Sequence, residues 1–281
     1  MQVRQTPAQL RQTAARLRLD VLRMIGYGKA GHLGGSFSLA EIVAALYFHV
    51  LRYDPKDIRN PDRDRFLLSK GHAVLIQYAA LVELGVIPPE EMDRVKTVEG
   101  MLQGHPDMER TPGIEAVTGS LGQGLSIAVG MALALRLDRR PSRVYVIMGD
   151  GELSEGQLWE AAMAATAHQV DNLTAIVDRN RIQATGPTIE VLPNPFIDDK
   201  FKSFGWSVTS MDGHDPSDIL RALEAAGSVR GAPSLIIANT VKGKGVSFAE
   251  NTAVFHNGIL SKEQFEQARA ELEAQLRAAQ G

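Results

Sequence analysis

The sequence predicts an α/β fold in which a mostly parallel sheet carries helices on both faces. The segment 143–187 has the order strand, glycine turn, helix, strand and polar turn, which is the order of a βαβ unit. Other short runs rich in β-branched residues alternate with helical patterns along the chain, as in parallel sheets. The 281 residues fit one large domain as well as two small ones. We expect residues 1–281 to form a single domain.

The N-terminal part of the chain predicts two helices separated by a turn. A Thr-Pro pair at 6–7 is typical of a helix start, and apolar residues then recur at helical spacing as far as Met24. The glycine-rich segment 31–36, GHLGGS, is expected to be a turn. Ser38 and Glu41 have the spacing of a capping box, which predicts the start of the second helix.

The remaining strands and helices are predicted from the spacing of apolar residues and from the residues typical of turns. Apolar runs bounded by Gly, Pro, Asn or Asp predict strands, and amphipathic runs predict helices. The long irregular segment 98–117 is expected to be a functional or a disordered loop. The expected strands are 66–69, 143–148, 173–177, 206–211 and 234–240. The expected helices are 38–51, 73–84, 88–97, 125–137, 155–168, 198–204, 216–226 and one capped by Ser261.

The composition excludes several classes of protein. Charged residues make up 22% of the chain and the net charge is −3, which argues against binding nucleic acid or an anionic membrane. There is no cysteine, so neither a disulfide framework nor thiolate chemistry is expected. The N-terminus lacks an apolar signal core, and no apolar run approaches the length of a membrane span. The expectation is therefore a cytoplasmic enzyme or enzyme subunit.

Two oxygen donors follow neighbouring strands of the central βαβ unit. Asp150 lies between two glycines directly after the first strand, and Asn180 follows the second. Because parallel strands end at the same edge of a sheet, we expect these side chains to lie side by side. Mg²⁺ prefers such oxygen ligands together with phosphate oxygens and water. An isolated Gly-Asp-Gly is more typical of a simple β-turn, but the asparagine after the next strand favours a Mg²⁺ and diphosphate site.

Two other glycine-rich segments lack the spacing of common phosphate-binding motifs. The segment 119–124 is not a dinucleotide fingerprint, because Ile127 occupies the position of the third glycine and no strand precedes it. KGKGVS at 242–247 does not have P-loop spacing. We interpret its lysines, Lys242 and Lys244, as parts of a solvated turn.

Taken together, these segments resemble transketolase. The matching motifs are GHLGGS at 31–36, LSKGH at 68–72, GHP at 104–106, TGSLGQG at 118–124, GDG at 149–151 with Asn180 beyond it, and KGKGV at 242–246. They occur in the order of that family, and the resemblance extends from about Ala14 to His256. It concerns only the amino-terminal half of a full-length transketolase. It implies the thiamin-diphosphate-binding fold of the PP type, with the pyrimidine-binding and C-terminal domains absent from this chain.

The resemblance also implies a set of site residues. The metal ion, Mg²⁺ with Ca²⁺ or Mn²⁺ as substitutes, would be bound by Asp150, Asn180 and the backbone carbonyl of Ile182. Thiamine diphosphate would be bound by His72, Gly119, Leu121, Asp150, Gly151, Glu155, Asn180, Ile182 and His256. The implied catalytic residues are His32, His105, His256 and Glu155.

Four histidines in glycine-flanked turns are the candidates for proton transfer, because imidazole titrates near neutrality. From the residues alone, His32 is equally well a loop histidine and His72 a helix cap. The resemblance implies that His32 and His256 lie near the C3 hydroxyl of the donor sugar and that His105 lies near the C1 hydroxyl. It also implies that Glu155 joins an acidic network between two active sites of a dimer. A first-turn glutamate favoured by the helix dipole explains Glu155 equally well.

The function implied by the resemblance is that of the N-terminal subunit of a split transketolase. Such an enzyme transfers a two-carbon ketol unit from a ketose phosphate to an aldose phosphate in the pentose phosphate pathway, with the thiazolium ring as electron sink. A separate C-terminal subunit, with two copies of each chain in a heterotetramer, would supply the catalytic glutamate and most sugar-phosphate contacts. Lys96 stands where many relatives have an arginine that binds the acceptor phosphate, which leaves the acceptor preference open.

Three other functions fit the same motifs. The first is a specialised transketolase subunit for an unusual ketose phosphate such as apulose 4-phosphate. The second is the α-subunit of a thiamine-dependent 2-oxoacid dehydrogenase, which shares the Asp150 to Asn180 unit, although GHLGGS and LSKGH do not match it. The third is a non-catalytic, cofactor-binding regulatory subunit, which the retained histidines and Asp150 argue against.

Overall fold

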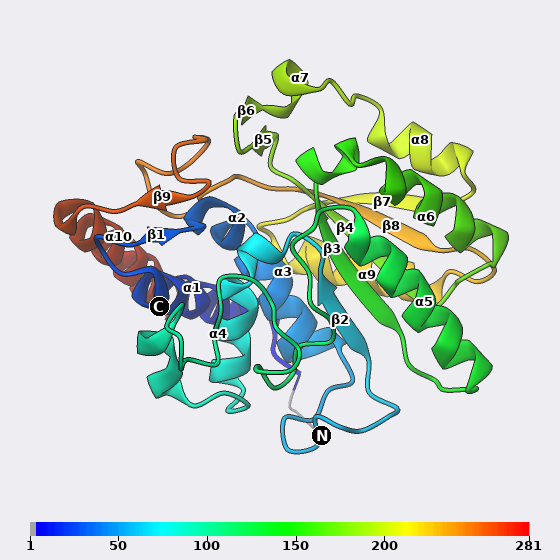
Figure 1. The fold of residues 1–281 in the computed structure, drawn as a ribbon, viewed down its shortest axis with the longest axis horizontal. Helices are drawn as coiled ribbons and strands as arrows, with labels where there is room; N and C mark the ends of the chain where they lie inside the picture. Colours follow the sequence, from blue (N-terminus) through cyan, green and yellow to red (C-terminus); the bar gives the residue numbers. More distant parts are fainter. Residues whose placement is uncertain (1–3, 281) are drawn as a thin grey trace.

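The computed structural model describes residues 4–280 and is organised around a five-stranded sheet (Figure 1). The strand order is β2-β3-β4-β8-β7, and every pairing in this sheet is parallel. The strands are β2 (Arg65–Leu68), β3 (Val144–Gly149), β4 (Leu173–Arg179), β7 (Ser207–Asp212) and β8 (Ser234–Asn239). The prediction of a mostly parallel sheet is confirmed, and each strand overlaps a predicted segment, with bounds that differ by one or two residues.

Helices cover both faces of the sheet because its strands are apolar on both sides. Tyr145 and Ile147 of β3 point into one core, whereas Val144 and Val146 point into the other. The first core contains α1 (Pro7–Ile25), α2 (Leu33–Phe37), α3 (Ala40–Ala45), the π-helical turn Leu46–Val50, α4 (Leu75–Glu83), α9 (Pro216–Ser228) and α10 (Lys262–Gln280). The second contains α5 (Gln123–Leu137), α6 (Gly156–Ala167) and α8 (Ile197–Ser203).

The first and last helices begin where the sequence predicts. Thr6 caps α1, accepting from the backbone N–H of Gln9, whose side chain in turn accepts from the N–H of Thr6. Ser261 and Gln264 make the same reciprocal pair before α10. None of the helices within residues 4–280 is long and apolar enough to cross a membrane.

The region after α1 differs from the prediction. GHLGGS contains the short helix α2 rather than only a turn. Ser38 does not cap the next helix, which begins at Ala40. Its hydroxyl instead donates to the carboxylate of Asp178 at 2.7 Å. Glu41 accepts from both terminal nitrogens of Arg18, at 2.6 and 2.7 Å, and both side chains are buried. The capping-box prediction is wrong because the buried guanidinium needs this carboxylate as its counter-charge.

The segment 88–97 is also shorter than predicted, because only the 3₁₀ turn Pro89–Arg94 is helical. The chain then reverses at Lys96, whose φ is 61°. Residues 98–117 contain no helix or strand, in agreement with the predicted irregular segment.

Two small antiparallel pairs were not predicted, since two-residue strands carry no periodic signal. The hairpin of β5 (Ile182–Gln183) and β6 (Gly186–Pro187) leads into the short helix α7 (Thr188–Val191). The other pair joins β1 (Ala30–Gly31) to β9 (Gly258–Ile259). Its register sets Gly31 opposite Gly258 and so brings the turns of His32 and His256 together.

Arg18→Met should lower the free energy of unfolding by about 3–5 kcal/mol, because it leaves a buried carboxylate without its guanidinium. Burial by itself raises the pKa of Glu41, but the charge of Arg18 and hydrogen bonds from His214 and Arg18 lower the pKa to about 2. Glu41 is therefore ionised at neutral pH, and the variant leaves its buried negative charge without a counter-charge. Urea unfolding at pH 7 measures the loss. Arg18→Met/Glu41→Leu should recover most of it, and a single-variant loss under about 1 kcal/mol, the value of a surface pair, would contradict this account.

Candidate active site

A cavity of about 520 Å³ lies at the carboxyl ends of β3 and β4. Open α/β sheets bind ligands at this edge. Every residue that the sequence analysis assigned to the metal, the cofactor or catalysis lines this cavity. These residues are His32, His72, His105, Gly119, Leu121, Asp150, Gly151, Glu155, Asn180, Ile182 and His256.

Asp150 and Asn180 lie just beyond the ends of adjacent strands. Gly149 of β3 pairs with Asp178 of β4. Asp150 comes directly after the first of these paired residues, and Asn180 comes two residues after the second. Asp150 is buried and accepts the backbone N–H groups of Gly151, at 2.9 Å, and of Arg181. The amide oxygen of Asn180 accepts from the N–H of Ile182 at 3.1 Å. A carboxylate and an amide oxygen therefore line the same part of the cavity.

This donor set fits a hard divalent cation. Burial, and next the charge of Asp178, raise the pKa of Asp150 to about 6, and no side-chain cation from residues 4–280 hydrogen-bonds to it. A cation beside this carboxylate would favour its charged form. Across the same described residues, no three His, Asp or Glu side chains are grouped as a metal site. A cation here would therefore rely on the amide of Asn180, the carbonyl of Ile182 and the oxygens of a bound diphosphate.

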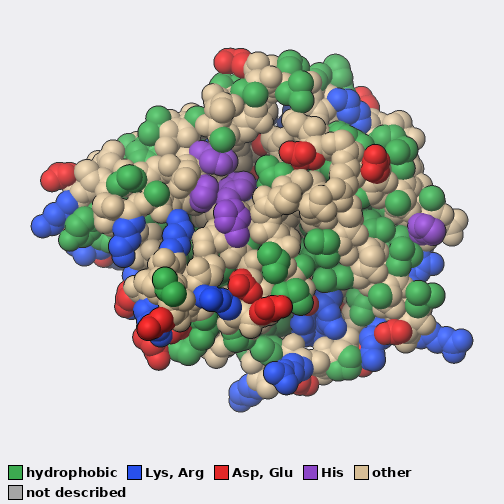
Figure 2. Space-filling view, viewed as in Figure 1, with side chains coloured by type: hydrophobic (Ala, Val, Ile, Leu, Met, Phe, Trp, Pro, Cys, Tyr) green, Lys and Arg blue, Asp and Glu red, His purple; other side chains and the backbone are tan. Residues whose placement is uncertain are grey.

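The four predicted histidines form one cluster at the cavity. The ring centroid of His32 lies 5.1 Å from that of His72, 6.3 Å from that of His105 and 5.5 Å from that of His256. The rings of His72 and His256 are 4.9 Å apart. Figure 2 shows histidine side chains gathered in a hollow near the middle of the face. The turns that carry these side chains are distant in sequence, and the fold brings them together.

The clustered histidines are neutral at pH 7, which corrects the expectation that they titrate near neutrality. Burial is the largest cause of the lowered pKa of each ring, and the ammonium groups of nearby lysines lower it further. The pKa is about 4 for His32, about 2 for His72 and about 3 for His256, and that of His105 is also lowered. Neutral imidazole has one donor and one acceptor nitrogen, so these rings suit hydrogen bonding to sugar hydroxyls.

Lys242 is a site residue that the sequence analysis misinterpreted. It is buried and lines the cavity, with its ammonium 2.7 Å from the carbonyl oxygen of Ile182 and 2.8 Å from Nδ1 of His256. Burial, and next the charge of Lys70, lower its pKa to about 8. The solvated-turn interpretation holds only for Lys244, which is partly exposed and lies 3.5 Å from Glu250. The sequence feature that could have identified Lys242 as a site residue is its position shortly after β8, at the same sheet edge as Asp150.

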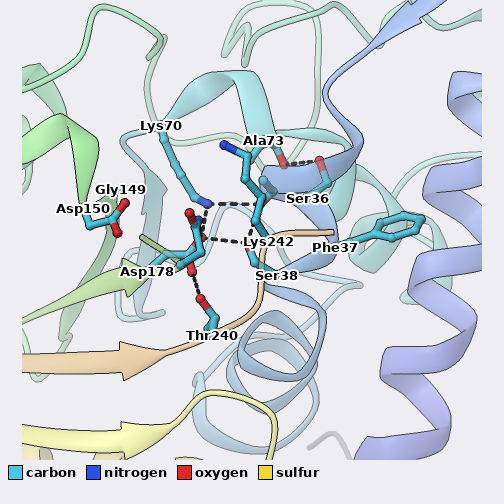
Figure 3. Close-up of polar contacts among 12 residues, drawn as sticks. Ser36, Phe37, Ser38, Lys70, Ala73, Gly149, Asp150, Asp178, Thr240 and Lys242 are labelled. Atoms are coloured by element: carbon cyan, nitrogen blue, oxygen red, sulfur yellow. Dashed lines mark hydrogen bonds and ion pairs between the residues drawn. The ribbon is translucent and has the colours of Figure 1, made fainter. Parts of the chain in front are cut away.

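Asp178 is a second residue that the sequence analysis missed. Its carboxylate is fully buried and accepts hydrogen bonds from Ser38 at 2.7 Å, from the amide nitrogen of Asn180 at 2.9 Å, and from Lys70 and Thr240. Figure 3 shows Ser38, Lys70 and Thr240 converging on it from different elements. Burial alone would raise the pKa of Asp178, but the charge of Lys70 and the hydrogen bonds from Lys70, Thr240 and Ser38 together lower it. Asp178 therefore fixes the orientation of the Asn180 amide, with its oxygen directed away from the carboxylate.

Two glutamates follow Asp150 and have different environments. Glu155 is exposed at the start of α6 and its side chain makes no capping hydrogen bond. Glu152 is buried and accepts from the backbone N–H groups of Gly122, at 2.8 Å, and Gly149, at 3.0 Å. Burial raises its pKa. Glu152 is thus the carboxylate that ties the two glycine turns together, and sequence reasoning did not single it out.

Gly119 and Gly151 are places where a side chain would not fit. The φ of Gly119 is 140°, and a Cβ there would lie 2.6 Å from Cδ2 of His105. A Cβ on Gly151 would lie 2.8 Å from Cβ of Gln183. These glycines leave backbone exposed to the cavity beside the histidines and Asp150.

Comparison with known proteins identifies the family. The profile described as "Transketolase, thiamine diphosphate binding domain" matches residues 10–278. The chain is 47% identical to the 6-deoxy-6-sulfo-D-fructose transketolase subunit of Clostridium sp. over 94% of this chain and 96% of that protein. It is 42% identical to an apulose-4-phosphate transketolase subunit of Phocaeicola vulgatus, covering 92% of each. The crystal structure of Campylobacter jejuni transketolase superposes with a TM-score of 0.87 at 30% identity, over 96% of this chain and 45% of that one.

Gly119→Ala should destabilise the chain by about 1–3 kcal/mol, because alanine is strained at this φ and its Cβ would press on the ring of His105. Gly130→Ala is the matched control. Gly130 lies in α5, and a Cβ at this position would have no atom within 4 Å, so alanine there should stabilise the helix by up to about 1 kcal/mol. Urea unfolding of both variants measures the contrast. Equal effects at the two positions would show that the Gly119 turn imposes no constraint.

Proposed function

The chain belongs to the transketolase family as a thiamine-diphosphate-binding domain, and from this premise we propose that it is the N-terminal subunit of a split transketolase. The observation that carries the proposal is one cavity in which a buried carboxylate, an amide oxygen and four neutral histidines meet at the sheet edge. The reaction would be transfer of a two-carbon ketol unit from a ketose to an aldose.

Thiamine diphosphate and Mg²⁺ are the proposed cofactors. Asp150, the amide of Asn180 and the carbonyl of Ile182 would hold the metal, with Ca²⁺ or Mn²⁺ as substitutes. Two buried lysines, Lys70 and Lys242, line the cavity and place positive charge beside the proposed diphosphate position. When bound, the cofactor supplies cleavage of the ketose between C2 and C3 and carries the two-carbon unit.

The histidines would orient the sugar and move its protons. We place His32 and His256 near the C3 hydroxyl of the donor and His105 near the C1 hydroxyl. The neutral rings of His32 and His105 support this role, since a ring with a low pKa keeps an unprotonated nitrogen that accepts a hydroxyl proton at pH 7. His72 and the backbone of Gly119 and Leu121 would contact the cofactor.

We propose that a separate C-terminal subunit completes the site with the pyrimidine-binding and C-terminal domains. The chain spans 96% of its Clostridium relative, whose name describes it as one subunit, but 42% of human transketolase, to which it is 38% identical. In the segment that follows the β5–β6 hairpin, Ile189, Leu192 and Phe196 are 60%, 54% and 68% exposed, which is unusual for a run of large apolar side chains. This surface suits a protein partner.

An assembly of two copies of each chain is the proposed state. Between Gln123 and Ala134, α5 carries no charged residue, although Gly130 and Ala134 of this helix are exposed. A helix without charges on its outer face is typical of one that is covered. Glu155 is exposed at the start of the neighbouring α6, where it would join an acidic network with a second copy. The cytoplasm and the pentose phosphate pathway remain predictions for its setting.

A specialised donor sugar is the second candidate, favoured by the names of the relatives. The Clostridium protein is named for a sulfonated ketose and the Phocaeicola protein for a ketose phosphate, so both sugars carry an anionic group. In this chain Lys96 lies close enough to His32 for its charge to lower the pKa of that ring, and its ammonium contacts the carbonyl of Ala30 at 2.8 Å. A lysine offers one point charge without the planar fork of arginine, so it would accept either a phosphate or a sulfonate.

The direct test is reconstitution with the C-terminal subunit encoded in the same genome. The two chains together with thiamine diphosphate and Mg²⁺ should catalyse ketol transfer to an aldose phosphate, whereas either chain alone should be inactive. A panel of ketose phosphates and a sulfonated ketose, measured by kcat/KM, would identify the donor. Full activity of this chain alone would refute the split enzyme.

Asp150→Asn is the control for the cofactor site. It removes the negative charge of one proposed metal ligand without changing side-chain size, and should weaken Mg²⁺-dependent binding of thiamine diphosphate by about 100-fold in calorimetry. Unchanged affinity would contradict the metal assignment. Tight cofactor binding by the assembled wild-type chains, with no turnover of any ketose, would instead favour a regulatory subunit.

A further inference from the structure

Lys242 connects the two halves of the candidate site. Its ammonium donates to the carbonyl of Ile182 at 2.7 Å and contacts Nδ1 of His256 at 2.8 Å. The residue is 2% exposed, so this geometry is held by the surrounding protein rather than by solvent. The backbone of the same turn is also fixed, since the N–H of Gly243 donates to the carbonyl of Gly34 at 3.0 Å.

The contact between Lys242 and His256 constrains the imidazole. An ammonium group has three donors and no acceptor, so the nitrogen that it contacts must be the acceptor. A neutral imidazole has one acceptor nitrogen, and its proton then lies on the other. We propose that Lys242 is a positioning residue that fixes His256 in the tautomer with the proton on Nε2, so that His256 meets a substrate as a hydrogen-bond donor.

His256 differs in this respect from the rest of the cluster. The rings of His32, His72 and His105 have no hydrogen bond to any of residues 4–280, so no group in this part of the chain selects their tautomers. Partners that hydrogen-bond one imidazole nitrogen commonly set the role of the other. In this cluster, the fixed ring is His256, and the adaptable rings of His32 and His72 lie 5.5 and 4.9 Å from it.

The consequence for catalysis rests on the proposed function. If His256 lies at the C3 hydroxyl of a donor sugar, its Nε2–H can donate to that oxygen but cannot take its proton. The proton would pass instead to an unprotonated nitrogen of His32, whose ring lies 5.5 Å from that of His256. Lys242 would thereby give the two histidines different roles, with His256 as the hydrogen-bond donor and His32 as the proton acceptor.

Nitrogen NMR of the free chain tests the tautomer directly. Long-range proton–nitrogen correlation of ¹⁵N-histidine-labelled protein distinguishes the two tautomers, and His256→Gln assigns the signals. Wild type should show His256 with the proton on Nε2 alone. Lys242→Met, which keeps a long unbranched stem but has no donor, should convert this signal to a mixture of tautomers. Lys242→Arg keeps a donor-only cation and should restore the single form.

Lys244→Met is the matched control, since Lys244 lies in the same turn and does not contact a histidine among the described residues. It should leave the His256 signals unchanged. A wild-type His256 with the proton on Nδ1, or a mixture, would overturn the proposal even if Lys242→Met failed to fold. An unchanged tautomer in folded Lys242→Met would do the same. The measurement needs neither cofactor nor partner, so inactivity of the assembled enzyme would count against the proposed function and leave this inference standing.

Discussion

The buried carboxylate of Asp178 is the interaction on which the site depends. It is 0% exposed and accepts hydrogen bonds from residues that follow β2, β4 and β8 and from the end of α2. One negative charge thereby connects the ends of β2, β4 and β8 to the end of α2. Because breaking a buried ion pair costs about 3–5 kcal/mol, Lys70 and Asp178 constrain each other strongly. The orientation of Asn180, and so the candidate cation site, follows from this arrangement.

The parts of the fold and site that the sequence predicted are those with local signals. The strand, glycine and helix order around Asp150 predicts a parallel pair, and parallel strands end at a common edge. That rule alone places Asp150 beside Asn180. The histidines required the family resemblance, since a histidine in a glycine-rich turn has several roles when considered alone. The cavity confirms that these residues lie together, whereas their roles remain proposals.

The parts that were not predicted depend on contacts between distant segments. In the sequence, Asp178 resembles any polar residue at the end of a strand. Its neighbouring residues do not indicate that Ser38 and Thr240 hydrogen-bond to it. Glu41 has the spacing of a cap, but Arg18, which lies 23 residues earlier, uses its carboxylate. Lys242 resembles a surface lysine because the turn around it is polar, yet the side chain is buried against Ile182 and His256. In each case a buried charge is paired through tertiary structure, and this pairing overrides local preference.

The central claim is that the edge where Asp178 holds Asn180 beside Asp150 binds a divalent cation and its diphosphate. The most direct measurement is anomalous diffraction from crystals of the chain, assembled with its C-terminal subunit, grown with thiamine diphosphate and Mn²⁺. The account predicts one manganese peak within coordination distance of Asp150 and Asn180, with the diphosphate beside it. A manganese peak elsewhere, or a diphosphate bound away from the ends of β3 and β4, would contradict it.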